Sequence, residues 1–127
     1  MKYKMLHTCL RVMDLEKSLT FYKDAIGLKE MRRKDFKEHQ FTLVFLTDDS
    51  EAYEVEITYN YNPEKPYEIG NGFSHLAVST PNLEASREKH IELGYEVTSL
   101  KGLPGEPPKY YFVTDPDGYK VEIIREQ

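Results

Sequence analysis

The 127-residue chain has little of several features that would place it in a particular class of protein. Its one cysteine, Cys9, excludes an internal disulfide framework. No apolar run reaches the length of a membrane span, and residues 1–6 lead to His7 before a signal-peptide core can develop. We therefore expect a cytoplasmic protein that does not associate with membranes. The net charge of −5 also excludes a broad basic surface for nucleic acid, although a small anionic ligand needs only a few local cations.

What the sequence does contain is typical of one ordinary globular domain. Apolar residues make up 39% of the chain and charged residues 31%. The length is sufficient for one core but not for two independent ones, so we expect a single domain over residues 1–127. No nucleophilic triad includes Cys9, which is predicted to be a small, half-buried strand residue.

The chain contains an internal repeat, which indicates how it folds. A shift of 68 positions places four residues on identical ones: His7 on His75, Leu15 on Leu83, Glu16 on Glu84 and Ser18 on Ser86. After a one-residue deletion Gly27 falls on Gly94, and after a further deletion Glu56 falls on Glu122. These identities mark the same structural events in the same order, which is harder to obtain by chance than isolated matches.

Each copy is predicted to have the element order βαβββ. The first copy is expected to have a strand over 7–12, a helix capped by Asp14 and ended by Gly27, and strands near 28–33, 41–46 and 52–60. The second is expected to have a strand over 73–79, a helix from the Asn82 cap to Leu93, strands near 95–100, 110–114 and 119–124, and a tight turn at 115–118. Residues 61–72, with two prolines and two glycines, are the predicted linker between module one (about 1–62) and module two (about 73–127).

Apolar stripes predict which helix faces are buried. In the first helix the stripe is Leu15, Leu19, Tyr22 and Ile26. His90 falls on the corresponding stripe of the second helix, so we expect it to be a packing residue. His39 lies in a charged run and is predicted to be on the surface.

Alternation along the strands predicts which side chains share a face. His7 is expected beside Cys9 and Arg11, Glu56 beside Glu54, Thr58 and Asn60, His75 beside Phe73 and Ala77, and Glu122 beside Lys120 and Ile124. The opposite faces are mostly apolar and suit coverage by a helix. Each of these strands therefore carries one histidine or glutamate on the face that its helix does not cover.

Two histidines and two carboxylates at repeat-equivalent positions form a coherent set of metal ligands: His7, Glu56, His75 and Glu122. Imidazole nitrogen and carboxylate oxygen suit divalent nickel, cobalt or zinc, and water can fill the remaining positions. Any one of the four alone would be interpreted as an isolated polar residue on an open sheet. Their equivalence in both copies favours one divalent metal ion.

Several motifs resemble the vicinal oxygen chelate superfamily and, within it, the bacterial glyoxalase I (lactoylglutathione lyase) family. They are residues 7–15, 18–22, 27–28, 56–60, 72–77 and 115–122, which together extend over nearly the whole chain. The Asp-Pro-Asp-Gly stretch is common across the superfamily, whereas Glu-Ile-Thr-Tyr-Asn at 56–60 favours glyoxalase I. The implied fold is α+β, with two tandem βαβββ modules forming a curved mixed sheet around a metal site.

The resemblance implies an enzyme that isomerises the methylglyoxal–thiol hemithioacetal to a 2-hydroxyacyl thioester, which is lactoylglutathione when the thiol is glutathione. Its four metal ligands would be His7, Glu56, His75 and Glu122, holding nickel or cobalt, with zinc possible. The metal polarises the substrate oxygens and stabilises an enediolate. Glu56 and Glu122 are the candidate bases. The sequence pattern does not distinguish them, and the resemblance favours Glu122.

The resemblance also implies substrate contacts. Arg11 and Asn60 would contact the γ-glutamyl part of glutathione, and the strand alternation independently places them on the ligand-bearing faces. Lys101 would meet the far end of the thiol. The loop 101–109 contains prolines and Glu106 where a Gly/Lys-rich loop is expected, so the cosubstrate is glutathione or another low-molecular-weight thiol.

A homodimer with metal sites at the interface is implied as well. One chain would supply His7 and Glu56 to a site, and the other chain His75 and Glu122. The short linker, stiffened by Pro63, suits modules held edge to edge within one chain.

Two classes of alternative remain open. A CoA-thioester epimerase of the same superfamily could use all four ligand positions and also forms an enolate. Extradiol dioxygenases and thiol transferases use a His/His/Glu set, so Glu56 counts against them. A metal-free ligand-binding or resistance module would have no use for the four ligands.

Overall fold

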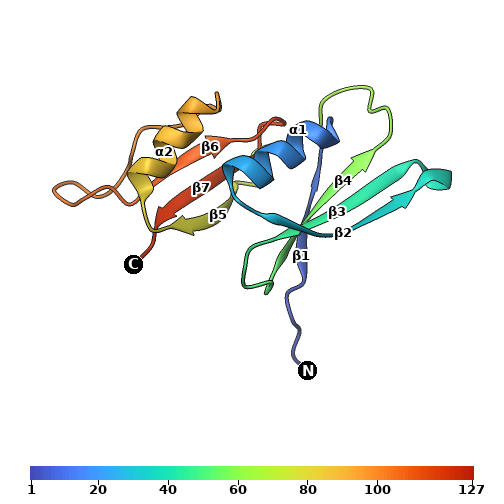
Figure 1. Cartoon of the computed structure of the whole chain (residues 1–127), viewed down its shortest axis with the longest axis horizontal. Coiled ribbons are helices and arrows are strands. Elements are labelled where there is room, and N and C mark those ends of the chain that lie inside the picture. The colour runs from blue at the N-terminus through green and yellow to red at the C-terminus, as the bar shows by residue number, and fades with distance from the viewer. The chain divides into compact units, whose positions relative to one another are not determined.

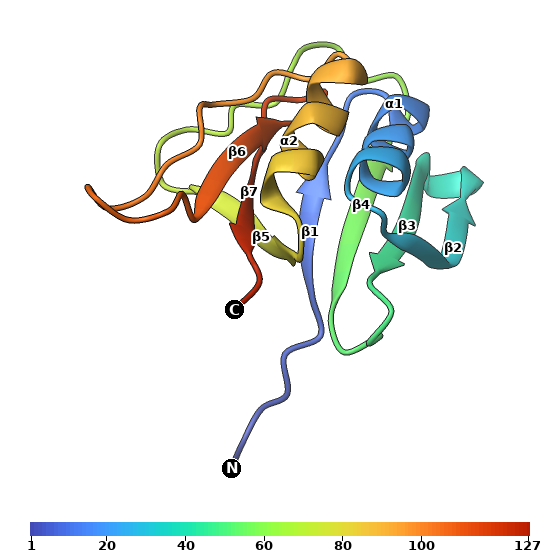
Figure 2. The same ribbon diagram turned by 60° about the vertical axis from the view of Figure 1, so that its left-hand side comes forward.

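The computed structural model describes all residues from Met1 to Gln127, which fall into two compact units, unit 1 (residues 1–68) and unit 2 (residues 69–127). The division lies within the predicted linker 61–72. In each unit a helix covers one face of a β-sheet (Figures 1 and 2). We call the opposite sheet face, which carries the predicted metal ligands, the ligand face. No helix is long and apolar enough to cross a membrane.

Unit 1 contains a four-stranded sheet in the order β1-β4-β3-β2. Its elements are β1 (His7–Arg11), α1 (Leu15–Thr20), the π-helix η1 (Phe21–Ala25), β2 (Lys29–Phe36), the 3-10 helix η2 (Lys37–His39), β3 (Phe41–Thr47) and β4 (Glu54–Asn60). β1 is parallel to β4, whereas β3 is antiparallel to both of its neighbours. The parallel pair places the first and last strands of the module side by side.

The first helix begins as predicted and ends differently. Asp14 accepts a hydrogen bond from Lys17 N at 3.1 Å, which caps α1. The last turns are π-helical, which rotates the buried face, so Phe21 and Ala25 are buried together with the expected Leu19 and Tyr22. Gly27, with φ +82°, then supplies the left-handed residue that ends the helix.

The core of unit 1 lies between this helix and the sheet. On the sheet side it contains Leu10 of β1, Val12 just after β1, Val44 and Leu46 of β3, and Ile57 of β4, each at most 3% exposed. These residues alternate with the ligand-face residues, as the predicted period of two requires. The sheet therefore presents its polar set on one side only.

Unit 2 repeats this plan with a three-stranded sheet in the order β5-β7-β6. Its elements are β5 (His75–Thr80), α2 (Leu83–Glu92), β6 (Tyr110–Thr114) and β7 (Lys120–Arg125). Asn82 caps α2 by accepting from Ala85 N at 3.1 Å. The turn before β7 forms as predicted: one oxygen of Asp115 accepts from Asp117 N at 2.8 Å and from Tyr119 N at 2.9 Å.

The predicted strand at 95–100 is wrong. Only two isolated bridges form in this region, Val97 with Val113 and Lys101 with Tyr110. Between them the Thr98 hydroxyl accepts from Phe112 N at 3.0 Å, so a side chain takes the place of a backbone partner and interrupts the ladder. Module two therefore has three strands where module one has four.

The prediction that His90 is a packing residue is confirmed. It is 1% exposed, and its Nδ1 lies 2.8 Å from the Tyr111 hydroxyl, which in turn lies 2.7 Å from Ser86 Oγ. Burial raises the pKa of Tyr111. The hydroxyl therefore stays protonated and joins α2 to β6.

Candidate metal centre

The first pair of predicted ligands comes together on the ligand face of unit 1. His7 Nε2 lies 2.9 Å from Glu56 Oε2, and the two side chains are 38% and 13% exposed. In the parallel register Glu54 is opposite His7 and Cys9 is opposite Glu56. The histidine therefore reaches diagonally across β1 and β4 to its glutamate.

The second pair has the same arrangement in unit 2. His75 Nε2 lies 3.1 Å from Glu122 Oε1, with side chains 31% and 18% exposed. Here Lys120 is opposite His75 and Ala77 is opposite Glu122, which is again a diagonal contact between parallel strands. The internal repeat in the sequence is thus a repeat of one local geometry.

An aromatic ring borders each pair, and neither ring was predicted from the sequence to be part of the site. Phe45, opposite Glu56 on β3, packs edge to face with His7 at 5.7 Å and 79°. Phe112, opposite Glu122 on β6, does the same with His75 at 5.2 Å and 77°. Both rings occupy equivalent places in the repeat, and that equivalence is the feature that could have identified them.

The second histidine is also held from its other side. Ser74 Oγ lies 2.7 Å from His75 Nδ1. Histidines that ligate metals commonly hydrogen-bond through the nitrogen that does not face the metal, which fixes the orientation of the ring. This contact leaves Nε2 for a ligand role.

The donor chemistry and spacing of each pair fit a divalent metal ion. The N–O distances of 2.9 and 3.1 Å place one imidazole nitrogen and one carboxylate oxygen side by side in each unit, close enough for both to bind one ion. No group of three or more His, Cys, Asp or Glu side chains is arranged to hold a metal in the structure, so each unit offers its predicted ligands as a pair.

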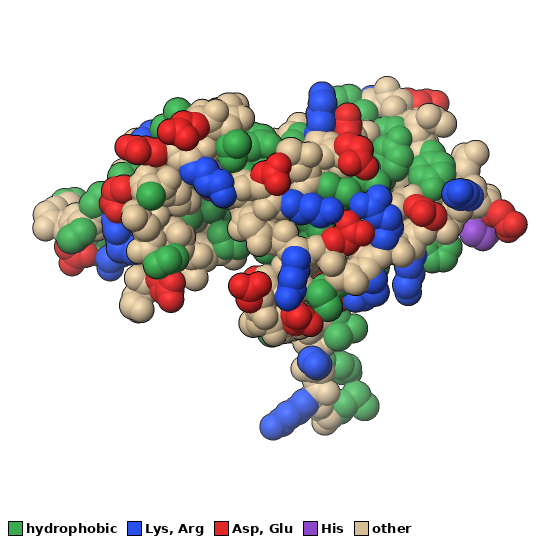
Figure 3. All heavy atoms as spheres, in the orientation of Figure 1, with side chains coloured by type: hydrophobic (Ala, Val, Ile, Leu, Met, Phe, Trp, Pro, Cys, Tyr) green, Lys and Arg blue, Asp and Glu red, His purple; other side chains and the backbone are tan.

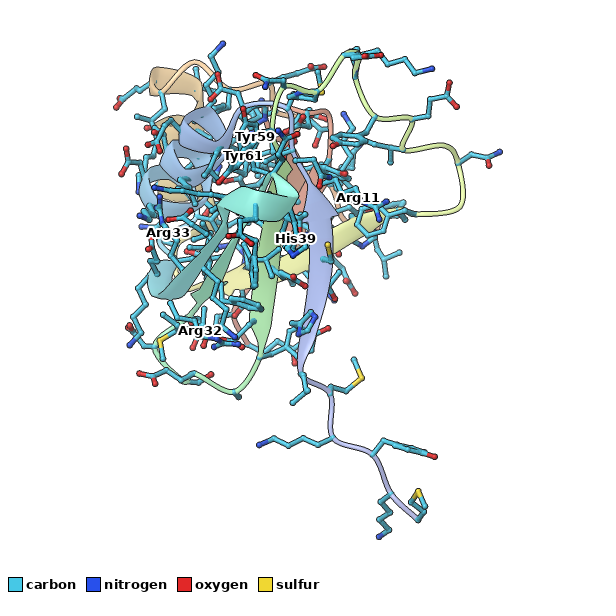
Figure 4. The ribbon with its side chains drawn as sticks, turned by 90° about the vertical axis from the view of Figure 1, so that its right-hand side faces the viewer. Arg11, Arg32, Arg33, His39, Tyr59 and Tyr61 are labelled. Atoms are coloured by element: carbon cyan, nitrogen blue, oxygen red, sulfur yellow. The ribbon has the colours of Figure 1, made fainter.

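The predicted substrate residues of unit 1 lie on the same face as its pair. Arg11 ends β1 and is opposite Thr58, two residues before Asn60 on the neighbouring strand (Figure 4). The Asn60 amide donates to the Tyr67 hydroxyl at 3.3 Å. A guanidinium and an amide near the end of two adjacent strands suit a carboxylate-bearing ligand.

Lys101 lies in unit 2, at the base of the loop 101–109. Its backbone bonds with Tyr110, while its side chain is exposed. A Cβ on Gly102 would lie 3.2 Å from Pro107 O, so a larger residue would require the backbone to shift slightly where the loop closes. Arg125 Nε donates to Pro108 O at 3.0 Å, which holds the far side of the loop.

Cys9 is exposed, not half-buried as expected. It is on the ligand face, and its Sγ lies 3.2 Å from Thr58 Oγ1. Acidic and basic side chains are mixed over the surface that Figure 3 shows, with no extended field of one sign.

Comparisons with known proteins show the family. The model of the Glyoxalase/Bleomycin resistance protein/Dioxygenase superfamily matches residues 4–123. Lactoylglutathione lyase of Neisseria meningitidis serogroup A is 39% identical over 131 residues, covering 98% of this chain and 91% of its own. Lactoylglutathione lyase of Escherichia coli O157:H7 is 39% identical over 127 residues, with 98% and 93% covered. Glyoxalase I of Leishmania major superposes with a TM-score of 0.86 at 31% identity, over 98% of this chain and 88% of that one.

The chain therefore belongs to the glyoxalase/bleomycin resistance protein/dioxygenase superfamily. Within this superfamily it is a lyase of the glyoxalase I type, related along nearly its whole length to bacterial lactoylglutathione lyases. The α+β fold with two βαβββ-like modules, expected from the sequence, is confirmed.

Proposed function

We propose that this enzyme isomerises the hemithioacetal of methylglyoxal and glutathione to lactoylglutathione, with one divalent metal ion per site. The metal would be held by two imidazoles and two carboxylates, those of His7, Glu56, His75 and Glu122. The observation that carries the proposal is the occurrence of the same His–Glu pair, at 2.9 and 3.1 Å, in both units. When bound, the metal supplies Lewis-acid polarisation of the substrate oxygens.

The chain itself must move one proton. The reaction moves a proton from the carbon that bears sulfur to the neighbouring carbonyl carbon, while the hydroxyl proton passes to the former carbonyl oxygen, so no external oxidant or reductant takes part. A carboxylate beside the substrate can perform both transfers. Glu56 and Glu122 are comparably exposed, at 13% and 18%, and each has one oxygen facing its histidine. We assign the main base to Glu122 because of the resemblance to glyoxalase I.

Nickel or cobalt is the proposed metal, with zinc as the less active alternative. Each pair offers one imidazole nitrogen and one carboxylate oxygen, and nickel and cobalt accept both kinds of ligand. Water or substrate oxygens would complete the coordination.

Turnover of methylglyoxal with a panel of thiols and added metals tests the proposal. Chelation should lower activity by about a hundredfold or more, and nickel or cobalt should restore more activity than zinc. Glutathione should be accepted, and a branched acyl-CoA thioester should not exchange its α-proton. Full activity after chelation, with no bound metal, would contradict the proposed function.

Arg11 is proposed to bind a carboxylate of the thiol adduct. Arg11→Lys should raise KM for the adduct about tenfold with little change in kcat, because lysine cannot reproduce a bidentate contact. Steady-state kinetics and metal stoichiometry measure this. Arg33→Lys on β2, whose guanidinium bonds to Glu30, is the matched control and should leave KM unchanged. Loss of metal affinity in Arg11→Lys with an unchanged KM would remove Arg11 from substrate binding.

We also propose a homodimer in which each metal receives one pair from each chain. Each unit offers only two of the four ligands, so a complete set requires both kinds of unit. The resemblance to bacterial glyoxalase I implies sites completed between two chains, and a two-fold dimer would give two equivalent sites.

A further inference from the structure

The ligand face carries a third carboxylate, Glu54, which is closer to His7 in strand register than Glu56 is. Glu54 is directly opposite His7 on the neighbouring strand, two residues before Glu56. Its side chain is 18% exposed, so it is part of the sheet surface and not a free surface group. His7 nevertheless pairs with Glu56. The Glu54 carboxylate is instead engaged by another side chain.

That group is Arg32. Its Nη1 donates to Glu54 Oε2 at 2.6 Å and its Nη2 donates to Glu54 Oε1 at 3.0 Å, so both carboxylate oxygens are engaged. A bidentate arginine contact fixes the plane of the carboxylate as well as its position. The positive charge of the guanidinium also offsets the negative charge of Glu54 beside the ligands.

Arg32 is itself held in place by the ring that borders the metal pair. It comes from β2, in register with Phe45 on β3, and its guanidinium lies 3.9 Å from the centre of the Phe45 ring. Phe45 packs against His7 with its edge-to-face contact. Arg32, which is labelled in Figure 4, thus crosses β3 over the Phe45 ring to reach Glu54 on β4. The cation–π interaction stabilises this arrangement.

Unit 2 reaches the same result with a different residue. The position equivalent to Glu54 is Lys120, which is opposite His75 and two residues before Glu122. Its ammonium donates to Thr114 Oγ1 at 2.8 Å. A lysine cannot act as a second carboxylate ligand. Each unit therefore offers a single carboxylate beside its histidine. In unit 1 the second carboxylate, Glu54, is paired with Arg32, and in unit 2 a lysine stands in its place.

We infer that Arg32 is a positioning residue that keeps Glu54 out of the metal's ligand set. This inference rests on the proposed function. Without Arg32, unit 1 would present His7, Glu54 and Glu56 to one ion, and carboxylate oxygens bind divalent ions readily. The additional carboxylate would tighten metal binding and occupy a position that the substrate oxygens need.

The experiment compares Arg32→Gln with the double variant Arg32→Gln/Glu54→Gln in the full-length protein loaded with cobalt. Chelator competition gives the metal affinity, visible absorption of the bound cobalt reports its ligands, and methylglyoxal turnover with glutathione gives kcat. Arg32→Gln should bind cobalt about tenfold more tightly, show an altered spectrum, and lose about tenfold in kcat. The double variant should return all three measurements to near the wild-type values.

Arg33→Gln is the matched control. Arg33 is the next residue of β2 and makes an equivalent bidentate contact with Glu30, which lowers the pKa of Glu30 to about 2. Neither residue is on the ligand face. Its substitution should leave cobalt affinity and kcat unchanged. Affinity and kcat that fall together in Arg32→Gln, without rescue by Glu54→Gln, would show that Arg32 only supports packing and would overturn the inference. A wild-type protein that binds no cobalt would overturn the proposed function, and this inference with it.

Discussion

His75→Ala should abolish turnover of the methylglyoxal–glutathione adduct and leave the fold intact. Substitution of a residue that merely orients a ligand costs about 10–100-fold in metal affinity or activity, so removal of the ligand itself should cost more than about a hundredfold. The His75 side chain is 31% exposed, so its truncation opens no buried cavity. Glu122→Gln should be equally inactive because it preserves shape but removes the anionic oxygen. Turnover, bound nickel and thermal unfolding measure the three consequences.

Two further variants set the scale of this effect. Ser74→Ala removes only the hydroxyl that contacts His75 Nδ1, so it should reduce activity by roughly tenfold. His39→Ala removes an exposed histidine of η2 and should have no effect. Full activity in His75→Ala would show that the four-ligand site is wrong.

A mixture of His7→Ala and His75→Ala chains, each inactive alone, should regain activity. In the proposed dimer, one site of a mixed pair would carry both lesions and the other neither. Random exchange makes half of the dimers mixed, so the mixture should reach roughly a quarter of wild-type activity. Turnover after subunit exchange, with exchange followed by differently labelled chains, measures this.

The matched control mixes His7→Ala with Glu56→Gln. Both lesions lie in unit 1, so every site of a mixed dimer would retain one lesion and no activity should return. If the His7→Ala and His75→Ala chains exchange and stay inactive, each site belongs to a single chain and the shared-site proposal fails.

Features set by local chemistry were predictable from the sequence. The caps Asp14 and Asn82 and the turn at 115–118 form as expected because their hydrogen bonds connect residues at most four apart. The alternation also placed His7, Glu56, His75 and Glu122 on the ligand faces, since a strand has a strict period of two. The metal itself and the joint role of these four residues stay predictions.

Features set by long-range register were not predictable in the same way. The strand at 95–100 fails because the Thr98 hydroxyl accepts a hydrogen bond from Phe112 N, 14 positions further along the chain, and no local pattern predicts that contact. Phe45 was not predicted to border the site, because its contact with His7 depends on the pairing of three strands. The Arg32–Glu54 contact also depends on the irregularity in β2 between Glu30 and Arg32, which shifts the register.

The two matching His–Glu pairs have a consequence for how this sequence can change over time. In a protein with only one such module, a site built from two copies of the module would have identical halves, so every mutation near the pair would alter both of them. Here the two copies are encoded separately, so Glu54 with its arginine and Lys120 with its threonine can occupy equivalent places. Tandem duplication thereby permits the two halves to change independently, and Arg11, which is proposed to bind the thiol adduct, is encoded in one half only.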